Sequence, residues 1–339
     1  MFFPRLLLIF IRLKFCIPTA TWLIIISLLS FSCSKQADDE PKPLEPTNHK
    51  LIIAGYIPYY SFHRFDLNCW NVLQRIYYFS LWPDAEGNFQ FFDRDIENLN
   101  TLKAHIEDEQ CELFIVIGGM YESETIHAMA ASKTKRTAYI QQLVDFCLGH
   151  EITGIDLDWE GYPYPVDQDD FRDLVNEMSL AFRQNNLLFT VALEVSHTDL
   201  AYQIKHQVDQ INLMSYGILD ANGNQATLLQ MAQWLDSYKQ NGFPSNQLIV
   251  GVPFFAWRPY AEGVDSPRAL TYRSIVEKST PSAHSNKYGV YSYNGPDLMR
   301  NKVDFLKKQG YHGIMAWELT QDMPFSSPYS LLAAIQTSN

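Results

Sequence analysis

The stretch Gly154-Ile155-Asp156-Leu157-Asp158-Trp159-Glu160 decides the fold of this chain and places its chemistry. Within it, acidic residues alternate with bulky apolar ones. Successive side chains of a β-strand point to opposite faces, so Asp156, Asp158 and Glu160 lie on one face, about 6–7 Å apart along the backbone. The three apolar residues point to the other face. We therefore interpret this stretch as the end of a buried strand that carries a row of carboxylates.

Such a row is costly inside a protein, because each carboxylate repels its neighbours and because burial disfavours the charged form. Proteins keep buried acids mostly where a function needs a carboxyl group with a raised pKa. An acid at every second position also arises by chance in about half of all chains with this length and composition. This row lies at the end of an apolar strand. That placement favours a catalytic role over a chance row of acids on an exposed strand edge.

The rest of the chain repeats one pattern around this strand. From Lys50 onward, short apolar runs that are typical of buried parallel strands alternate with amphipathic stretches that predict helices. The predicted strands are Leu51–Ile57, Arg75–Leu81, Glu112–Ile117, Gly154–Asp158, Leu188–Leu193, Gln210–Ser215, Leu248–Phe254 and Gly313–Trp317. The predicted helices include Ile96–Glu109, Lys133–Leu148, Gln168–Gln184, Ala226–Gln240 and Pro296–Lys308.

Eight β/α units of this size predict an α/β fold, a single (β/α)8 TIM barrel over residues 50–339, with its active site at the carboxyl ends of the strands. A doubly wound sheet is the alternative, but no GxGxxG motif follows the first strand. Between Ala256 and Gly313 there is room for two helices and a modest loop. We therefore predict no sizeable insertion domain, and a shallow, open cleft.

The N-terminal end has a different composition. Residues 1–32 contain three basic residues and no acid, and their apolar run is shorter than a membrane-spanning helix needs. Because Ser32 precedes Cys33, residues 1–32 resemble a bacterial lipoprotein signal peptide that leads to lipidation of Cys33. An ordinary secretory signal is the alternative.

Residues 33–49 are polar, acidic and rich in proline, which predicts an extended tether. Within them, Asp38-Asp39-Glu40 resembles the export signal of surface-displayed lipoproteins in some Gram-negative bacteria. We therefore expect an exported protein that is lipid-anchored at the bacterial outer membrane, facing either the periplasm or the cell exterior.

Composition excludes several classes of function. The chain has 38 acidic and 26 basic residues, a net charge of −12, which argues against nucleic-acid binding. Cys69, Cys111 and Cys147 have no CxxC spacing, and we expect them to be small buried hydrophobic residues. The nine histidines form no HExxH motif, so we predict no metal and no other cofactor. We expect a monomer that contacts the membrane only through its anchor.

Several short motifs resemble those of glycoside hydrolase family 18, the chitinases and endo-β-N-acetylglucosaminidases. The acidic strand resembles the family signature DGxDxDxE. The other matching motifs, in chain order, are Ala54-Gly55-Tyr56, Ile117-Gly118-Gly119 for SxGG, Met214-Ser215-Tyr216 for MxY, Gly251-Val252-Pro253-Phe254-Phe255 for GxPFY, and Gly313-Ile314-Met315-Ala316-Trp317 for GxMxW, followed by Asp322. Together they cover roughly residues 50–337.

The resemblance implies a retaining glycosidase in which the 2-acetamido group of the substrate attacks its own anomeric carbon. In this mechanism Glu160 is the general acid that protonates the glycosidic oxygen. Asp158 orients the acetamido group. Asp156 lies beneath Asp158 and shares a proton with it. Tyr216 donates a hydrogen bond to the acetamido oxygen.

The resemblance also implies a set of substrate-binding residues. Trp317 forms the floor under the sugar that is cleaved, and Tyr56 and Met214 line the same pocket. Core packing is the alternative for these three. Met120 stands where chitinases usually have a tryptophan for the leaving-group sugar, and Tyr121 is a candidate replacement. The glycine pair at 118–119 is interpreted as a close approach of the backbone.

The sequence departs from the family pattern near the acids. Thr153 replaces the first Asp of the signature, and Ile117 replaces the Ser of SxGG. We therefore expect a shorter carboxylate row and a drier pocket below Asp156, with less to hold its charge. Gly217 replaces the Asp that commonly follows MxY, and Asp220 is near enough in sequence to compensate.

Three hypotheses follow for the function. The first is a chitinase-type hydrolase of β-1,4-linked N-acetylglucosamine, and the second is an enzyme that cuts the chitobiose core of N-glycans. The third is a non-catalytic glycan-binding barrel, which the presence of Glu160 disfavours.

Overall fold

The computed structural model describes residues 50–106, 111–161, 167–260 and 268–339, which all lie in the unit Pro46–Asn339. The predicted signal peptide, residues 1–32, the tether, residues 33–49, and the lipidation site Cys33 lie outside the described residues. Within the described ranges, no helix is long and apolar enough to cross a membrane.

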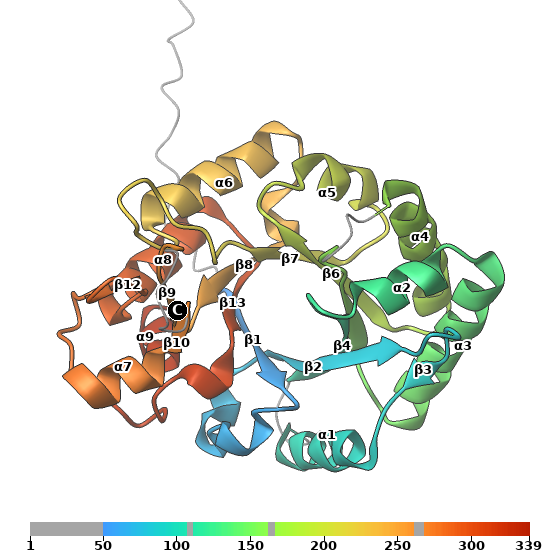
Figure 1. Ribbon diagram of the computed structural model, residues 1–339, viewed down its shortest axis with the longest axis horizontal. Coiled ribbons are helices and arrows are strands. Elements are labelled where there is room, and N and C mark those ends of the chain that lie inside the picture. Colours follow the sequence, from blue (N-terminus) through green and yellow to red (C-terminus); the bar gives the residue numbers. More distant parts are fainter. Residues whose placement is uncertain (1–49, 107–110, 162–166, 261–267) are drawn as a thin grey trace, which may run out of the picture. The chain divides into compact units, whose positions relative to one another are not determined.

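Eight parallel strands close into a barrel, as the sequence predicted. They are β1 (Ile52–Pro58), β2 (Arg75–Pro83), β4 (Glu112–Gly118), β5 (Gly154–Asp158), β6 (Leu188–Glu194), β7 (Gln210–Met214), β8 (Leu248–Pro253) and β13 (Gly313–Trp317). β1 pairs in parallel with both β2 and β13, which closes the ring seen in Figure 1. The predicted TIM barrel is therefore confirmed.

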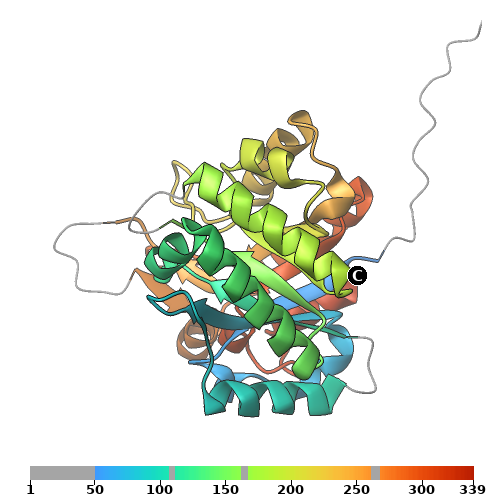
Figure 2. The ribbon, with the colours of Figure 1, turned by 90° about the vertical axis from the view of Figure 1, so that its right-hand side faces the viewer.

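Helices surround this ring, and Figure 2 shows the helices of the green region, α2 to α4, packed outside the strands. The α-helices are α1 (Asp93–Ile106), α2 (Ser123–Ala130), α3 (Lys133–Gly149), α4 (Gln168–Gln184), α5 (Thr198–Ile204), α6 (Leu228–Gln240), α7 (Tyr272–Ser279), α8 (Pro296–Gln309) and α9 (Leu331–Ser338). The short 3-10 helices are η1 (Phe62–Arg64), η2 (Leu67–Val72), η3 (Ser245–Gln247) and η4 (Leu319–Gln321).

The five helices predicted between strands are all present, with ends that differ by a few residues. α6 begins two residues later than predicted, because Thr227 caps it and forms a capping box with Gln230. The predicted helix Ile96–Glu109 corresponds to α1, and its last residues, 107–109, lie outside the described residues.

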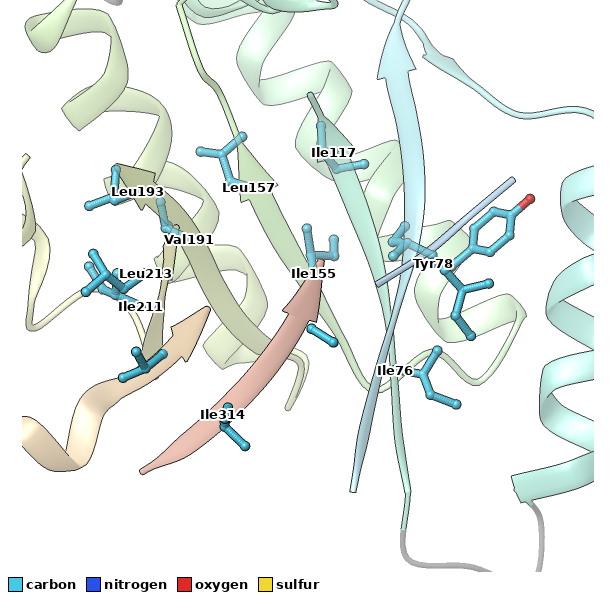
Figure 3. Packing of buried hydrophobic residues seen from close by; sticks show 14 of the residues in the cluster. Ile76, Tyr78, Ile117, Ile155, Leu157, Val191, Leu193, Ile211, Leu213 and Ile314 are labelled. Atoms are coloured by element: carbon cyan, nitrogen blue, oxygen red, sulfur yellow. The ribbon is translucent and has the colours of Figure 1, made fainter. Parts of the chain in front are cut away.

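The strands have two different faces. Figure 3 shows the outer face, where residues such as Ile155, Leu157 and Ile117 pack in one large apolar core with the helices. The alternate residues point into the barrel, where Tyr56, Tyr77 and other side chains form a separate, smaller cluster. The strict alternation of strand side chains therefore separates an apolar outer core from an aromatic and polar interior.

The segment between β8 and β13 holds more regular structure than the sequence indicated. It contains the two expected helices, α7 and α8, and no sizeable domain. In place of the predicted loop there is a small antiparallel sheet made of β9 (Phe255–Trp257), β10 (Ala269–Thr271), β11 (Lys287–Tyr288) and β12 (Tyr291–Ser292), in the order β10-β9-β12-β11. Strands of two or three residues are too short to show an alternation, which is why the sequence did not reveal them. A further short strand, β3 (Phe89–Gln90), pairs with the end of β2.

A buried arginine fills the amino-terminal end of the barrel. Arg75 begins β2 and is only 2% exposed. Its Nε donates to Glu112 Oε2 at 2.7 Å, and its Nη1 donates to Gln210 Oε1 at 2.9 Å and to the Tyr77 hydroxyl at 3.2 Å. The guanidinium also lies over the ring of Phe114. These contacts connect β2, β4 and β7 at the bottom of the barrel.

We expect Arg75→Met to lower the free energy of unfolding by about 2–4 kcal/mol, because it leaves the hydrogen-bonding groups of Tyr77, Gln210 and Glu112 without their donor. Urea unfolding measures this effect. Lys103→Met is the control, because Lys103 pairs with the highly exposed Glu151 and such surface pairs contribute about 0–1 kcal/mol. Equal stability of the two variants would contradict the structural role of Arg75.

Candidate active site

The three acids of the predicted row lie at the carboxyl end of β5, and the barrel places them at successively higher levels. Asp156 is completely buried and Asp158 is 3% exposed, whereas Glu160 follows the end of the strand and is half-buried. Catalytic residues of TIM barrels lie at this end of the strands. The row therefore runs from the barrel interior toward the open end of the barrel.

Asp156, at the lowest level, is held by donors from three other strands. Its Oδ2 accepts a hydrogen bond from the Tyr56 hydroxyl at 2.7 Å. Its Oδ1 accepts from the Thr190 hydroxyl at 2.6 Å and from Asn212 Nδ2 at 2.9 Å. Burial raises the pKa of Asp156, while these three hydrogen bonds act in the opposite direction. The expectation that little holds its charge is therefore wrong.

The two substitutions below Asp156 do not act as expected. Ile117 pairs in register with Leu157 and packs on the outer face, so it does not lie beside Asp156. The residue opposite Asp156 on β4 is Val116. Thr153 lies on the same alternate face as Ile155, and its Oγ1 accepts a hydrogen bond from the Leu113 backbone at 3.1 Å. Position 153 is therefore not the base of the carboxylate row.

Asp158 is the least satisfied member of the row. Its Oδ1 is buried and has no hydrogen-bond partner among the described residues. Its pKa is raised well above the usual range, first by burial and then by the negative charges of Glu160, Asp156 and Glu194. Asp158 and Asp156 thus carry the same carboxyl group, but Asp156 has three hydrogen-bond donors whereas Asp158 has an unpartnered oxygen.

The glycine pair at the end of β4, Gly118 and Gly119, fixes the backbone of Asp158. The Gly119 amide donates to the Asp158 carbonyl oxygen at 2.7 Å. Gly118 has φ +114°, and a Cβ atom there would lie 2.2 Å from that same oxygen. Only glycine fits this approach. The pair is structural, as the sequence indicated.

Glu160 has a pKa near neutrality. Burial raises its pKa to about 7, the charge of Glu194 adds to this effect, and a hydrogen bond from the Met120 backbone amide acts in the opposite direction. A carboxyl group with this pKa can hold a proton at neutral pH and release it to a bound group. The side chains of Met120 and Tyr121 are 44% and 79% exposed, so both are open to solvent beside Glu160.

The remaining predicted site residues lie around the same acids. Tyr216 follows β7, and the charges of Asp158 and Glu160 contribute, after burial, to its raised pKa. A Cβ atom on Gly251 would lie 2.6 Å from the Tyr216 ring, so this glycine makes room for it. Met214 ends β7 and is half-buried.

Trp317 and Tyr56 form the aromatic side of the site. The half-buried Trp317 ring lies 5.3 Å from the Tyr56 ring and 4.7 Å from the Phe79 ring, both in edge-on contacts. Tyr56 is almost completely buried, and its hydroxyl is already bonded to Asp156. Tyr56 therefore packs against Trp317 from a more buried position, and Trp317 is the more accessible of the two.

Three residues of this site were missed by sequence reasoning. Thr190 and Asn212 bind Asp156, and Glu194 contributes a further negative charge. A signal was present for each: Asn212 is a polar residue between two apolar residues of β7, and Thr190 and Glu194 share one face of β6.

Two further acids that the sequence motifs pointed to, Asp322 and Asp220, have hydrogen-bond partners outside the acidic row. Asp322 is buried, and its carboxylate accepts hydrogen bonds from Ser330 and from the first backbone amides of α9. Asp220 accepts hydrogen bonds from the backbone amides of Asn222 and Asn224, so it organises its own loop rather than replacing the missing Asp at Gly217.

Within the described ranges, the cysteines are mostly buried and the potential metal ligands form no cluster. Burial raises the pKa of the Cys69 and Cys147 thiols to about 12, and both residues are buried as predicted, whereas Cys111 is half-buried. In the part of the chain that the structure describes, no group of three or more His, Cys, Asp or Glu side chains is arranged to hold a metal ion.

A sequence model of glycosyl hydrolases family 18 matches residues 36–322 of this chain. An endochitinase of Manduca sexta is 24% identical over 285 residues, which cover 62% of this chain and 50% of the relative. Chitinase-3-like protein 2 of Homo sapiens is 24% identical over 311 residues, or 71% of this chain and 78% of the relative. The chain thus spans half the length of the insect protein.

Solved structures share the fold. A GH18 chitinase, ChiB, from the chitin utilization locus of Flavobacterium johnsoniae has a TM-score of 0.73 at 22% identity, covering 85% of this chain and 94% of its own. A chitinase from Bacteroides thetaiotaomicron has a TM-score of 0.73 at 20% identity, covering 85% and 96%. At this level of identity the likeness establishes the common barrel.

We expect Asp158→Asn to stabilise the fold by about 1–2 kcal/mol at neutral pH, because it removes an unsatisfied buried carboxylate and its repulsion with three other acids. The native pKa of Asp158 is raised, so wild-type stability falls as pH rises above the unfolded value of about 4. The gain should therefore disappear at pH 4 and below. Calorimetric melting across this pH range measures it, and a variant that melts lower than wild type at pH 7 would contradict this account.

Proposed function

The chain belongs to glycoside hydrolase family 18, and we propose that it is a retaining, chitinase-like hydrolase that cleaves β-1,4 linkages of N-acetylglucosamine-containing glycans by substrate-assisted catalysis. The observation that carries this proposal is the contrast between two adjacent acids. Glu160 has a pKa suited to donating a proton, and Asp158 presents a buried oxygen that lacks a hydrogen-bond donor.

Glu160 acts as the general acid in this proposal. Its position beyond the end of β5 leaves it half-buried, so a glycosidic oxygen can approach it from the open end of the barrel. Its pKa of about 7 keeps a large fraction protonated in neutral solution. Transfer of this proton to the glycosidic oxygen allows the leaving-group sugar to depart as an alcohol.

Asp158 supplies the acceptor for the acetamido N–H. A substrate amide is a donor, and the Oδ1 atom of Asp158 has none among the described residues. Formation of this bond satisfies a buried carboxylate and orients the acetamido oxygen toward the anomeric carbon. The negative charge of Asp158 then stabilises the positive charge that develops on the oxazolinium ring.

Asp156 holds the interior of the site in place. Its two oxygens already accept three hydrogen bonds, which fixes the carboxylate directly beneath Asp158. In this position its charge opposes ionisation of Asp158. The pair thereby favours a shared proton, which stays on Asp156 when Asp158 accepts the N–H of the substrate amide.

The surrounding side chains complete the sugar site. Tyr216, next to the acids, donates a hydrogen bond to the acetamido oxygen, and Trp317 lies under the sugar ring. Met214 lines the wall between them. On the leaving-group side, the exposed Met120 and Tyr121 offer an apolar and aromatic surface for the departing sugar.

The relatives favour chitin over N-glycans as the substrate. The similar proteins described above are an endochitinase, a chitinase-like protein and two chitinases. Cleavage of the chitobiose core of N-glycans remains the alternative, because it uses the same acetamido chemistry. A non-catalytic glycan-binding barrel does not require the raised pKa of Glu160.

We expect Glu160→Gln to lower kcat/KM on chitooligosaccharides by about 10²–10⁴-fold, the usual contribution of a general acid. Release of reducing ends measures the loss, and a high-mannose glycoprotein is assayed beside the oligosaccharides. Glu151→Gln is the control, because Glu151 is exposed and precedes β5 at the opposite end of the barrel. Cleavage of the glycoprotein alone would select the alternative substrate, and an unaffected Glu160 variant would refute the mechanism.

We also propose that the protein is exported and anchored to the outer membrane through a lipid on Cys33, with residues 34–49 as the tether. The basic and apolar composition of residues 1–32 supports this proposal. We expect Cys33→Ala to move the full chain from the membrane fraction to the soluble fraction in a Gram-negative host. Cys69→Ala is the control, and a wild-type protein that is already soluble would contradict the anchor.

A further inference from the structure

Glu194 lies at the carboxyl end of β6, on the strand next to the one that carries the acids. In the register of β5 and β6, Asp156 is opposite Thr190, and the Thr190 hydroxyl reaches Asp156 inside the barrel. Residue 194 has the same alternation as residue 190, so it belongs to the interior face of β6. Glu160 lies four positions after Asp156, and Glu194 lies four positions after Thr190. The two glutamates are therefore level with each other.

The backbone of Glu194 is fixed, but its carboxylate is not. Its carbonyl oxygen accepts hydrogen bonds from the Tyr238 hydroxyl at 2.9 Å and from the His197 amide at 3.0 Å. Its side chain is exposed, and none of the ion pairs found within the described ranges involves it. On the other side, Glu194 pairs in register with Met214 of β7. The anchored backbone thus keeps the Glu194 carboxylate between Glu160 and Met214, and no cation among the described residues forms an ion pair with it.

The groups that face Glu160 from the neighbouring elements are almost all acidic or neutral. Asp158 and Asp156 come from β5, Glu194 from β6, and the Tyr216 hydroxyl from the residues after β7. The Met120 amide, after β4, donates a hydrogen bond. The charge of Arg75 acts on Asp156, and it does so from the far end of the barrel.

We propose that Glu194 is a positioning residue that keeps the catalytic proton on Glu160, because its backbone anchors a negative charge beside the Glu160 carboxyl group. This inference rests on the proposed function, in which Glu160 is the acid. Loss of the proton from Glu160 would place two negative charges side by side at the open end of the barrel. The charge of Glu194 opposes that loss, and it does so without touching the substrate.

The direction of the effect on activity follows from the role of Glu160. The acid must be protonated in the free enzyme, so kcat/KM falls as pH rises through its pKa. The charge of Glu194 raises that pKa, second only to burial. Removing the charge lowers the pKa, and the alkaline limb of the pH profile moves to lower pH.

The test is the pH profile of kcat/KM for Glu194→Gln on chitooligosaccharides, from pH 4 to pH 9. We expect the alkaline limb to move to lower pH by about 0.5–1 unit, because one charge acts across a partly solvated gap. The value of kcat/KM on the acid side of this limb should not change. At 1 M salt, where the Debye length is about 3 Å, the wild-type and variant limbs should converge. Glu194→Asp should keep most of the wild-type profile, because it keeps the charge.

Glu124→Gln is the matched control, because Glu124 is an exposed glutamate in the first turn of α2, which follows the neighbouring strand β4. Its alkaline limb should stay in place. An unmoved limb in Glu194→Gln overturns the inference, and so does a raised KM with an unmoved limb, which would mean direct contact with the substrate.

A second readout separates this inference from the proposed function. In protein labelled with ¹³C at glutamate carboxyl groups, the signal missing from Glu160→Gln reports the titration of Glu160 directly. We expect its midpoint to fall in Glu194→Gln, and a midpoint equal to that of wild type overturns the inference. An inactive wild-type protein refutes the proposed function, whereas this titration still decides the role of Glu194.

Discussion

The hydrogen bonding of Asp156 inside the barrel is the interaction on which the site depends. The alternation of β5 forces this carboxylate into the interior, where burial without partners would be prohibitive. Tyr56, Thr190 and Asn212 satisfy it from β1, β6 and β7. One buried side chain therefore ties four strands together at the level just below the catalytic groups.

These bonds continue downward through the barrel. The Tyr77 hydroxyl donates to Asn212 Oδ1 at 3.1 Å, and Arg75 donates in turn to the Tyr77 hydroxyl. A connected series of polar groups thus runs from the ion pair of Arg75 and Glu112 to Asp156. It places a cation at the closed end of the interior and leaves the open end uniformly acidic. Asp156 is thereby satisfied, whereas Asp158, directly above it, has an oxygen without a donor among the described residues.

The three acids have the same chemistry but different environments, and the environments assign their roles. Asp156 has its hydrogen bonds, Asp158 is buried with an unpartnered oxygen, and Glu160 is near water and beside Glu194. Of these three acids, Asp158 has the buried oxygen that a donor could satisfy, and Glu160 has the pKa near neutrality that suits proton donation. The level of each residue along β5 sets how much solvent and how many donors it meets.

Features of the fold and the site that depend on neighbouring residues in the sequence could be predicted, whereas contacts between distant strands could not. The alternation of apolar and acidic residues within one strand predicted the face that carries the acids, and repeated apolar runs predicted all eight barrel strands. The donors of Asp156 were not predicted, because they come from strands 34 to 100 residues away and depend on register. The same limit explains the error over Ile117: only the pairing of β4 with β5 shows that Val116 is opposite Asp156.

The apolar face of β5 explains how the fold tolerates this site. Ile155, Leu157 and Trp159 are buried in the outer core, and each such side chain contributes about 1.5–3 kcal/mol. Each unit by which a carboxyl pKa is raised costs about 1.4 kcal/mol when the group ionises. The two faces of this short strand therefore act on stability in opposite directions. A strand that carries unsatisfied acids on one side has to be strongly apolar on the other, and the sequence of β5 has that form.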